Sequence, residues 1–232
     1  MLRVGLTGDL GSGKSTVARM LAERGAVVLS SDEMGRELMR PNEPVFDLIV
    51  ATFGAAVVAA DGTLDRHRLA TLAFDRVHPR VEELNAIVHP AVIEAQSKYL
   101  AQLALSNPDA IVVIESALIF STTHSREGSW RKRFDRILLV EAPESEKIAR
   151  FADRIAAGRE LSGEERVGIE SDARRRLVVQ QAAQQAVQQT GAYAADCLVL
   201  HNDGDIEFLE QQVDVVWIEL KRLAAATASP NF

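Results

Sequence analysis

The sequence has little of several things that would assign it to a specialised class of protein. It contains one cysteine, Cys197, in 232 residues, so it cannot build a disulfide framework of its own and suits a reducing compartment. No apolar run approaches the roughly 18 residues that a membrane-spanning helix needs. Acidic residues outnumber basic ones and the formal net charge is −7, which argues against general binding of nucleic acid.

What is present fits an ordinary globular protein. The hydrophobic fraction is 47% and the charged fraction 25%, and this length suits one α/β domain with an appended helical subdomain. We expect no signal peptide, because the first apolar run is followed at once by a glycine-rich loop. We therefore expect a cytoplasmic protein that works without a membrane or nucleic acid.

Glycine is concentrated in one short stretch near the start. The pattern G-x-x-x-x-G-K-[ST] is matched at every fixed position by Gly8-Asp9-Leu10-Gly11-Ser12-Gly13-Lys14-Ser15, between an apolar run and an amphipathic helical pattern. Glycines let consecutive backbone N–H groups point inward, and a helix N-terminus adds positive potential, so the main chain can hold a polyphosphate. A glycine-rich turn with a surface lysine is the alternative, and the spacing and context disfavour it.

The side chains of this loop have separate expected roles. Lys14 would reach the β- and γ-phosphates of a nucleotide, and the Ser15 hydroxyl would ligate Mg²⁺. The residues expected to contact the nucleotide here are Gly8, Gly11, Ser12, Gly13, Lys14, Ser15 and Thr16.

Five short apolar runs punctuate the chain and alternate with helical patterns. They cover residues 2–7, 26–29, 110–114, 136–140 and 197–200. Continuous apolar strands separated by helices indicate a parallel sheet covered on both faces. We predict a five-stranded parallel sheet of the P-loop NTPase type, with a helical insertion and a lid. Ligands of such sheets bind beyond the carboxyl ends of the strands, so the residues after each run are candidates for chemistry.

Two carboxylates follow predicted strands. Asp32 comes after the second run and begins a helical pattern; by position it is equally an N-cap or a carboxylate that accepts a proton from an attacking hydroxyl. Glu115 follows the third run, where P-loop enzymes commonly carry a carboxylate of the Walker-B type. A solvated carboxylate at a strand end is an equal alternative for Glu115.

The segment between the second and third runs contains only helical patterns and turns. It is too long for a simple crossover connection, so we expect residues 41–106 to form a helical subdomain for a second substrate. His89-Pro90 interrupts the helical pattern there. A lone histidine beside apolar residues is more often structural than a ligand.

Arginines gather after the fourth run. Arg150 and Arg154 lie in a predicted helix, and a charged, glycine-punctuated stretch from Gly158 to Arg176 follows. An arginine-rich segment between two helices of a phosphate-loop protein suggests a lid whose guanidinium groups close over the phosphates. A helical hairpin with solvated arginines is the alternative.

In this order the pieces resemble the dephospho-coenzyme A kinase family over nearly the whole chain. The opening loop alone would not separate kinase families. The specific part is the pair of motifs Asp-Gly-x-Leu-x-Arg, at residues 61–66, and Leu-Asn-x-x-x-His-Pro, at residues 84–90, in the right order and spacing. Asp32 ahead of Gly35 also looks like the end of the second strand in that family.

The resemblance implies ATP-dependent phosphorylation of the ribose 3′-hydroxyl of dephospho-coenzyme A, with ATP and Mg²⁺. It implies Asp32 as the base, and Lys14 with lid arginines stabilising the transferring phosphoryl group. The further residues that we carry over are Arg150 and Arg154 as catalytic arginines, Asn202 and Gly204 at the nucleotide, and Arg66, His89, Pro90 and Leu118 with Asp32 at the acceptor. We expect a monomer or weak homo-oligomer.

One kinase domain would then consist of three parts. The core takes residues 1–40, 107–145 and 190–225, the insertion 41–106 and the lid 146–189.

The sequence departs from the family at four places. Before Asp32, Ser31 replaces an expected small residue and Ser30 an acidic one. Asp9 stands where the family usually has glycine, and we expect its carboxylate to turn outward. The stretch from Glu115 to Ser121 lacks the proline and the last glutamate of the Asp-x-Pro-Leu-Leu-Phe-Glu motif of the family. The lid region is several residues longer than usual, so its arginines cannot be matched one by one.

Two other functions stay open at this point. The nearer is a kinase of another small metabolite, such as a nucleoside monophosphate or a sugar acid. The more distant is a nucleotide-dependent switch or binding protein, which Asp9 would favour, although the guanine-selecting Asn-Lys-x-Asp sequence is absent.

Overall fold

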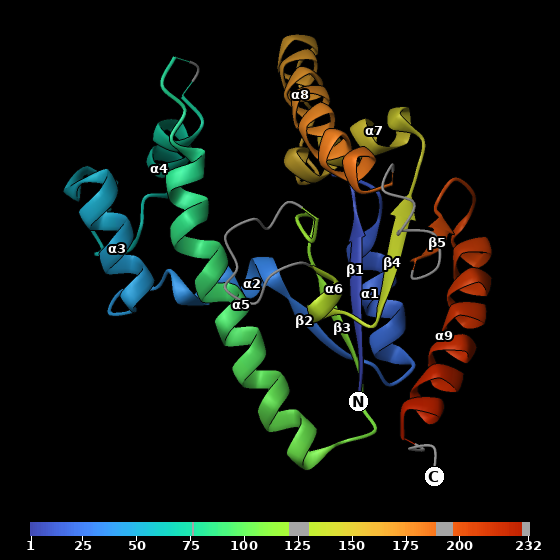
Figure 1. The fold of residues 1–232 in the computed structure, drawn as a ribbon. Helices are drawn as coiled ribbons and strands as arrows, with labels where there is room; N and C mark the ends of the chain where they lie inside the picture. Colours follow the sequence, from blue (N-terminus) through green and yellow to red (C-terminus); the bar gives the residue numbers. More distant parts are fainter. Residues whose placement is uncertain (76, 121–129, 189–196, 229–232) are drawn as a thin grey trace. The chain divides into compact units, whose positions relative to one another are not determined.

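The computed structural model describes residues 1–75, 77–120, 130–188 and 197–228 (Figure 1). These residues form two compact units. The first contains residues 1–29, 106–120, 130–188 and 197–228, and the second contains the described residues of 30–105.

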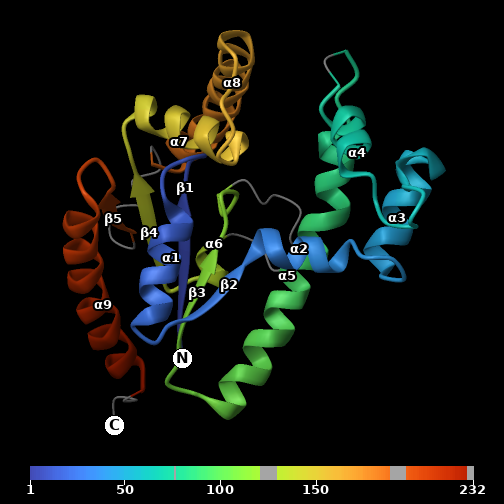
Figure 2. The same cartoon turned by 180° about the vertical axis from the view of Figure 1, so that it is seen from behind.

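The first unit is built on a five-stranded sheet. Its strands are β1 (Leu2–Gly8), β2 (Val27–Ser30), β3 (Ile111–Glu115), β4 (Arg136–Glu141) and β5 (Cys197–His201). The strand order is β2-β3-β1-β4-β5, with β1 parallel to both β3 and β4, and β4 parallel to β5 (Figures 1 and 2). The predicted parallel sheet is confirmed, and each strand ends one residue beyond its predicted run.

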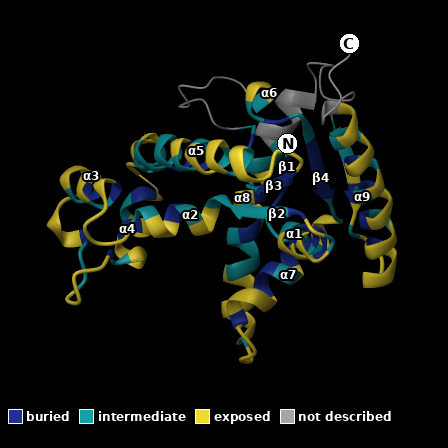
Figure 3. Ribbon diagram, turned by 90° about the horizontal axis from the view of Figure 1, so that it is seen from below, coloured by how far each residue is buried: buried dark blue, intermediate teal, exposed yellow. Residues whose placement is uncertain are grey.

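One face of the sheet is covered by α1 (Lys14–Glu23) and α9 (Ile206–Ala228). In the sequence, apolar residues recur at three- and four-residue steps from Ile206 to Leu223 and predict a helix with one face on the sheet. The structure confirms this, because Leu209, Val213, Val216 and Leu220 are buried. In Figure 3 the central strands are dark blue, whereas the outward side of α9 is yellow. The sequence from Ala224 to Phe232 suggests a frayed tail. The helix instead continues to Ala228, so this prediction is wrong for residues 224–228.

The opposite face is closed at the centre of the sheet by side chains that converge on Gly5. The terminal methyl groups of Ile119 and Ile137 and the ring of Phe134 lie where a side chain at residue 5 would stand. The short helix α6 (Trp130–Arg133) leads into Phe134. This packing covers the middle of β1, three residues before the strand ends at Gly8 and the glycine-rich loop begins.

Two long helices form a hairpin between β4 and β5. They are α7 (Glu144–Ala156) and α8 (Gly163–Gln188), and they enclose a small core of Ile148, Phe151, Ala173 and Leu177, with Leu10 and Ile169 packed against it. The sequence predicts an arginine-rich stretch, residues 158–176, between two helices. In the structure only residues 157–162 separate α7 from α8, and the rest of that stretch is helical. The reason is that the charged residues of α8 satisfy one another along the helix surface at three- and four-residue spacing.

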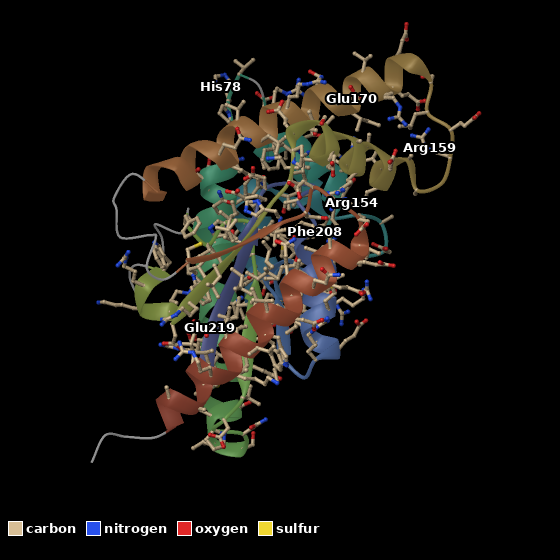
Figure 4. The ribbon with its side chains drawn as sticks, turned by 90° about the vertical axis from the view of Figure 1, so that its right-hand side faces the viewer. His78, Arg154, Arg159, Glu170, Phe208 and Glu219 are labelled. Atoms are coloured by element: carbon tan, nitrogen blue, oxygen red, sulfur yellow. The ribbon has the colours of Figure 1, made fainter. Side chains whose placement is uncertain are left out.

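Five surface arginines of the hairpin form ion pairs. The ion pairs are Arg159–Glu165, Arg166–Asp153, Arg174–Glu170, Arg175–Asp172 and Arg176–Asp172. Figure 4 shows Arg159 at the turn and Glu170 on α8. The alternative of a helical hairpin with solvated arginines therefore describes the secondary structure better than a separate arginine-rich segment.

The second unit is helical, as predicted. It contains α2 (Ser31–Leu38), α3 (Pro44–Phe53), the short 3₁₀ helix η1 (Ala55–Val57), α4 (Arg66–Ala73) and most of α5 (Val81–Ser106). Its core is formed by Val45, Ile49, Phe53, Val57, Leu64, Leu69 and Ala73.

The predicted interruption at His89-Pro90 is wrong, because α5 runs straight through it. A proline inside a helix removes one backbone hydrogen bond and crowds the preceding turn. Here Leu84, Ile87, Val88 and Ala91 pack against the core of the second unit on both sides of the proline. Burial of this apolar face offsets the cost of the missing bond.

The second unit begins earlier than the predicted insertion, at Ser30 rather than residue 41, so that α2 belongs to it. Gly35 of α2 allows Val88 and Val92 of α5 to approach closely. Gln96 of α5 is only 2% exposed and donates its amide to the Ser31 hydroxyl at 2.9 Å. These contacts fix the first turn of α2 on α5.

Candidate active site

The glycine-rich loop follows β1 and leads into α1. Gly11 has φ 74° and Gly13 has φ 99°, both in the left-handed region that favours glycine. A Cβ atom at Gly11 would collide with the backbone carbonyl of Lys147, and one at Gly13 would collide with the amide nitrogen of Asn202. Glycine is therefore required at both positions by the backbone conformation and by the close approach of neighbouring elements.

The inner side of the loop carries groups that suit a phosphate. The first N–H groups of α1 have no partner within the helix, and they carry its positive dipole end. The Ser12 hydroxyl is buried and, within the part of the chain that the structure describes, has no hydrogen-bond partner. Lys14 donates to the carbonyls of Gly8 at 2.8 Å and Asp9 at 2.9 Å. Unused donors and an ammonium group on one loop fit a bound phosphate.

Asn202 and Arg150 brace this loop from outside. The side-chain amide of Asn202 donates to the Ser12 carbonyl at 2.8 Å, and its backbone N–H donates to the Glu141 carbonyl at 2.7 Å. The Arg150 guanidinium donates to the Asn202 carbonyl through two nitrogens, each at 3.2 Å, and pairs with Glu146. The loop, the end of β5 and α7 are thus joined by one chain of hydrogen bonds.

The other nucleotide-side candidates are more exposed. Ser15 is exposed on the first turn of α1, where Thr16 is half-buried. Arg154 is exposed on α7, with its guanidinium 5.4 Å from the centre of the Phe151 ring. Gly204 is exposed after β5 and lies against Phe208, which Figure 4 labels together with Arg154.

At the start of α8, next to the turn of the hairpin, the pKa of Glu165 is strongly lowered. A hydrogen bond from the Ser162 backbone N–H, with further bonds from Arg159 and the Ser162 hydroxyl, lowers the pKa of Glu165 to about 2. A carboxylate whose pKa is lowered on folding contributes stability above its ordinary pKa, and loses it as the pH falls toward the folded value. The turn therefore keeps this stabilisation at neutral pH.

Asp32 lies on the first turn of α2 and is exposed. The N-cap of this helix is Ser30, whose hydroxyl accepts from the Glu33 N–H at 3.3 Å. The alternative that Asp32 is the N-cap is therefore wrong. Its neighbour Ser31 is held by the buried Gln96, so the backbone beneath Asp32 is fixed while its carboxylate is exposed.

The Asp-Gly-x-Leu-x-Arg motif is explained residue by residue in the second unit. The Thr63 hydroxyl and backbone N–H donate to Asp61 and lower its pKa. Leu64 is buried in the core, and Asp65 caps α4 by accepting from the Arg68 N–H at 2.9 Å. Arg66, the first residue of α4, is exposed.

The remaining acceptor-side candidates are divided between the units. His89 and Pro90 lie half-buried in the middle of α5, in the second unit with Asp32 and Arg66. Leu118 lies in the first unit after β3, half-buried, and its N–H donates to the Ser116 hydroxyl at 3.2 Å. The structure brings together the loop, Asn202 and Arg150.

The prediction that Asp9 turns outward is wrong. Asp9 is only 8% exposed, and Lys147 of α7 donates to its carboxylate at 2.8 Å. Sequence analysis missed Lys147, although a carboxylate inside a phosphate-binding loop was itself a signal that a cation should lie nearby. It also gave no role to Gln180 of α8, whose side-chain carbonyl accepts from the Leu10 N–H at 2.8 Å.

The described residues contain neither a metal-binding cluster nor a membrane-spanning helix. No cluster of three or more His, Cys, Asp and Glu side chains is placed to hold a metal ion. No helix in the described ranges has the length and apolar character needed to cross a bilayer.

A comparison with known protein families decides between the functions left open by the sequence. The family model described as dephospho-CoA kinase matches residues 2–207. The chain belongs to the dephospho-CoA kinase family. The fold and the phosphate loop are those expected for a kinase of this family, and neither a kinase of another metabolite nor a switch protein is favoured.

Individual relatives agree with this assignment. The dephospho-CoA kinase of Moorella thermoacetica is 34% identical, with alignment over 100% of this chain and 98% of that protein. The dephospho-CoA kinase of Syntrophus aciditrophicus is 36% identical over 100% of this chain and 90% of its own length.

Solved structures show the same fold. The crystal structure of TT1252 from Thermus thermophilus has 29% sequence identity and a TM-score of 0.65, covering 94% of this chain and 97% of that one. Dephospho-CoA kinase from Campylobacter jejuni shares the fold at 18% identity and a TM-score of 0.55, covering 95% and 97%.

Asn202→Ala should weaken nucleotide binding without unfolding the protein. Loss of the hydrogen bond to the Ser12 carbonyl should cost about 1 kcal/mol, or roughly fivefold in affinity. Titration calorimetry with ATP measures the effect, and Asp203→Ala, which changes the exposed neighbour of Asn202, is the control. Equal affinity of the two variants would remove Asn202 from the support of the loop.

Proposed function

We propose that this chain transfers the γ-phosphoryl group of ATP to the ribose 3′-hydroxyl of dephospho-coenzyme A, giving coenzyme A and ADP. This is the last step of coenzyme A biosynthesis. The observation that carries the proposal is the match of nearly the whole chain to the dephospho-CoA kinase family, supported by a phosphate loop with its donors in place. We also propose that the protein is cytoplasmic and is a monomer or a weak homo-oligomer.

The nucleotide would be held mainly by backbone. The proposed contacts are Gly8, Gly11, Ser12, Gly13, Lys14, Ser15 and Thr16, with Asn202 and Gly204 from the end of β5. Ser15 would be the protein ligand of Mg²⁺, since this ion commonly keeps several waters and takes its other ligands from phosphate oxygens. When bound, Mg²⁺ neutralises charge that develops on the phosphates.

The acceptor would be activated by Asp32. Its exposed carboxylate, on a turn fixed by Ser30 and Gln96, can orient the 3′-hydroxyl and take its proton as the bond to phosphorus forms. The proposed acceptor contacts are Asp32, Arg66, His89, Pro90 and Leu118. Arg66 supports this assignment because it is exposed beside a turn whose other residues have structural partners.

Charge on the transferring group would be stabilised by cations from two elements. Lys14 of α1 lies within the loop, and Arg150 and Arg154 lie four residues apart on one side of α7. Phosphoryl transfer depends mostly on positioning and charge stabilisation, because the protein forms no covalent bond to the substrate. Arg150 already braces the loop through Asn202.

The experiment that tests this function is ADP release by the purified chain with Mg²⁺ and ATP, with and without dephospho-coenzyme A. We expect release to depend on dephospho-coenzyme A, and to be at background with nucleoside monophosphates or sugar acids. Release that follows one of those other acceptors, or needs no acceptor, would contradict the proposal.

Asp32→Asn should lower turnover by about 10²–10⁴-fold, because the amide cannot take a proton from the 3′-hydroxyl. Affinity for ATP should be unchanged, since Asp32 is not among the loop residues. Glu33→Gln, the same chemical change at the next exposed position, is the matched control and should keep normal turnover. Near-normal turnover of the Asp32 variant, measured by coupled ADP release, would remove it from the mechanism.

Lys14→Ala should cost about 10²–10³-fold in kcat, because it removes a preorganised charge at the transferring phosphoryl group. Arg66→Ala removes one contact of the insertion and should cost only about tenfold in kcat/KM, mainly through KM for dephospho-coenzyme A. Steady-state kinetics of both variants provide the comparison. A larger loss of kcat in the Arg66 variant would contradict the assigned roles.

A further inference from the structure

Asp9 places a negative charge inside a loop whose other features all favour an anion. It directly follows Gly8 and is 8% exposed. The α1 N-terminus, the glycine backbone and Lys14 supply positive potential on the same loop. An uncompensated carboxylate here would repel a polyphosphate strongly, because charges near a protein surface are screened much less than charges in bulk water.

Lys147 supplies the compensating charge. Its ammonium group lies 2.8 Å from a carboxylate oxygen of Asp9, and the side chain is buried, with the residue 7% exposed. Lys147 sits in the first turn of α7, where its backbone N–H donates to the Pro143 carbonyl at 3.0 Å. The cation is thus carried by a regular helix rather than by a flexible surface segment.

The hairpin holds each of three successive loop residues by a different contact. Asp9 is paired with Lys147, the Leu10 N–H donates to Gln180, and the Gly11 backbone lies against the Lys147 carbonyl. The Leu10 side chain also packs on the small core of the hairpin. Figures 1 and 2 show α7 and α8 at the loop end of β1. Lys147 therefore belongs to the support of the loop through both its side chain and its backbone.

We propose that Lys147 is a positioning residue that neutralises Asp9 and so keeps the phosphate loop able to bind a nucleoside triphosphate. The inference rests on the proposed function for the identity of the nucleotide. The loop needs Lys147 because Asp9 is there, so loss of Lys147 should be harmful and loss of Asp9 should not. If the pair merely joined α7 to the loop, loss of either residue should be equally harmful.

Neutralisation of Asp9 and a purely structural link predict different outcomes, because single and double substitutions of a buried pair have different effects. Removal of one charge leaves the other buried without compensation, whereas replacement of both charges is often nearly neutral. If Lys147 acts by neutralising Asp9, then loss of Lys147 is harmful only while Asp9 is charged. If the pair acts only as a structural link, then loss of either member alone should weaken ATP binding by a similar amount, whatever the charge of the ligand.

The test is a set of ATP titrations with full-length Lys147→Met, Asp9→Asn and the double variant. We expect Lys147→Met to weaken ATP binding at least tenfold, and the double variant to recover to within about threefold of the wild type. Asp9→Asn alone should bind ATP at least as tightly as the wild type. Lys221→Met, the same change at an exposed lysine of α9, is the control.

The charge of the ligand gives a second readout. The loss caused by Lys147→Met should be largest for ATP, smaller for ADP and smallest for AMP, because the repulsion from Asp9 grows with the phosphate charge. Equal losses for all three nucleotides would overturn the inference. So would a double variant that binds ATP no better than Lys147→Met.

If Lys147→Met fails to fold, Asp9→Asn and the double variant still test the inference. A tenfold loss of ATP affinity in Asp9→Asn or in the double variant would overturn the inference. These titrations need no acceptor. A chain that shows the expected binding pattern but no ADP release with dephospho-coenzyme A would contradict the proposed function and leave the role of Lys147 standing.

Discussion

The conformation of the glycine-rich loop depends on one constraint, the close approach of neighbouring backbone and side chains. At Gly11 and Gly13 the loop passes so near to Lys147 and Asn202 that no side chain would fit. These contacts hold Gly11 and Gly13 in left-handed backbone conformations that a free loop would leave. The conformational entropy of the loop is lost when the protein folds, so it need not be lost again when a nucleotide binds. The loop is therefore held in this conformation before a nucleotide binds.

The parts of the fold that could be predicted from the sequence are those set by local pattern. Continuous apolar runs gave the strands, and the fixed spacing of Gly8, Gly13, Lys14 and Ser15 gave the loop. The course of α5 through Pro90 could not be predicted, because it depends on packing between residues distant in sequence. The burial of Asp9 was missed for the same reason, since its partner lies 138 residues away.

The same distinction applies to the candidate site. The structure excludes the N-cap role considered for Asp32, because Ser30 caps α2, and the role of Asp32 as a base is a proposal. The resemblance identified residues 61–66 as a motif, and the structure gives local structural roles to Asp61, Leu64 and Asp65. The acceptor contact of Arg66 is a proposal. The arginines of α8, which the sequence suggested as lid residues facing phosphate, form ion pairs on the helix surface.

The central claim is that the main chain of this loop holds the triphosphate. It is tested most directly by ¹H–¹⁵N NMR of the protein titrated with ATP and Mg²⁺. The account predicts that the amide signals of Gly11, Ser12, Gly13 and Lys14 shift together and saturate at one nucleotide per chain. Unchanged loop amides at saturating ATP, while other parts of the chain respond, would contradict it.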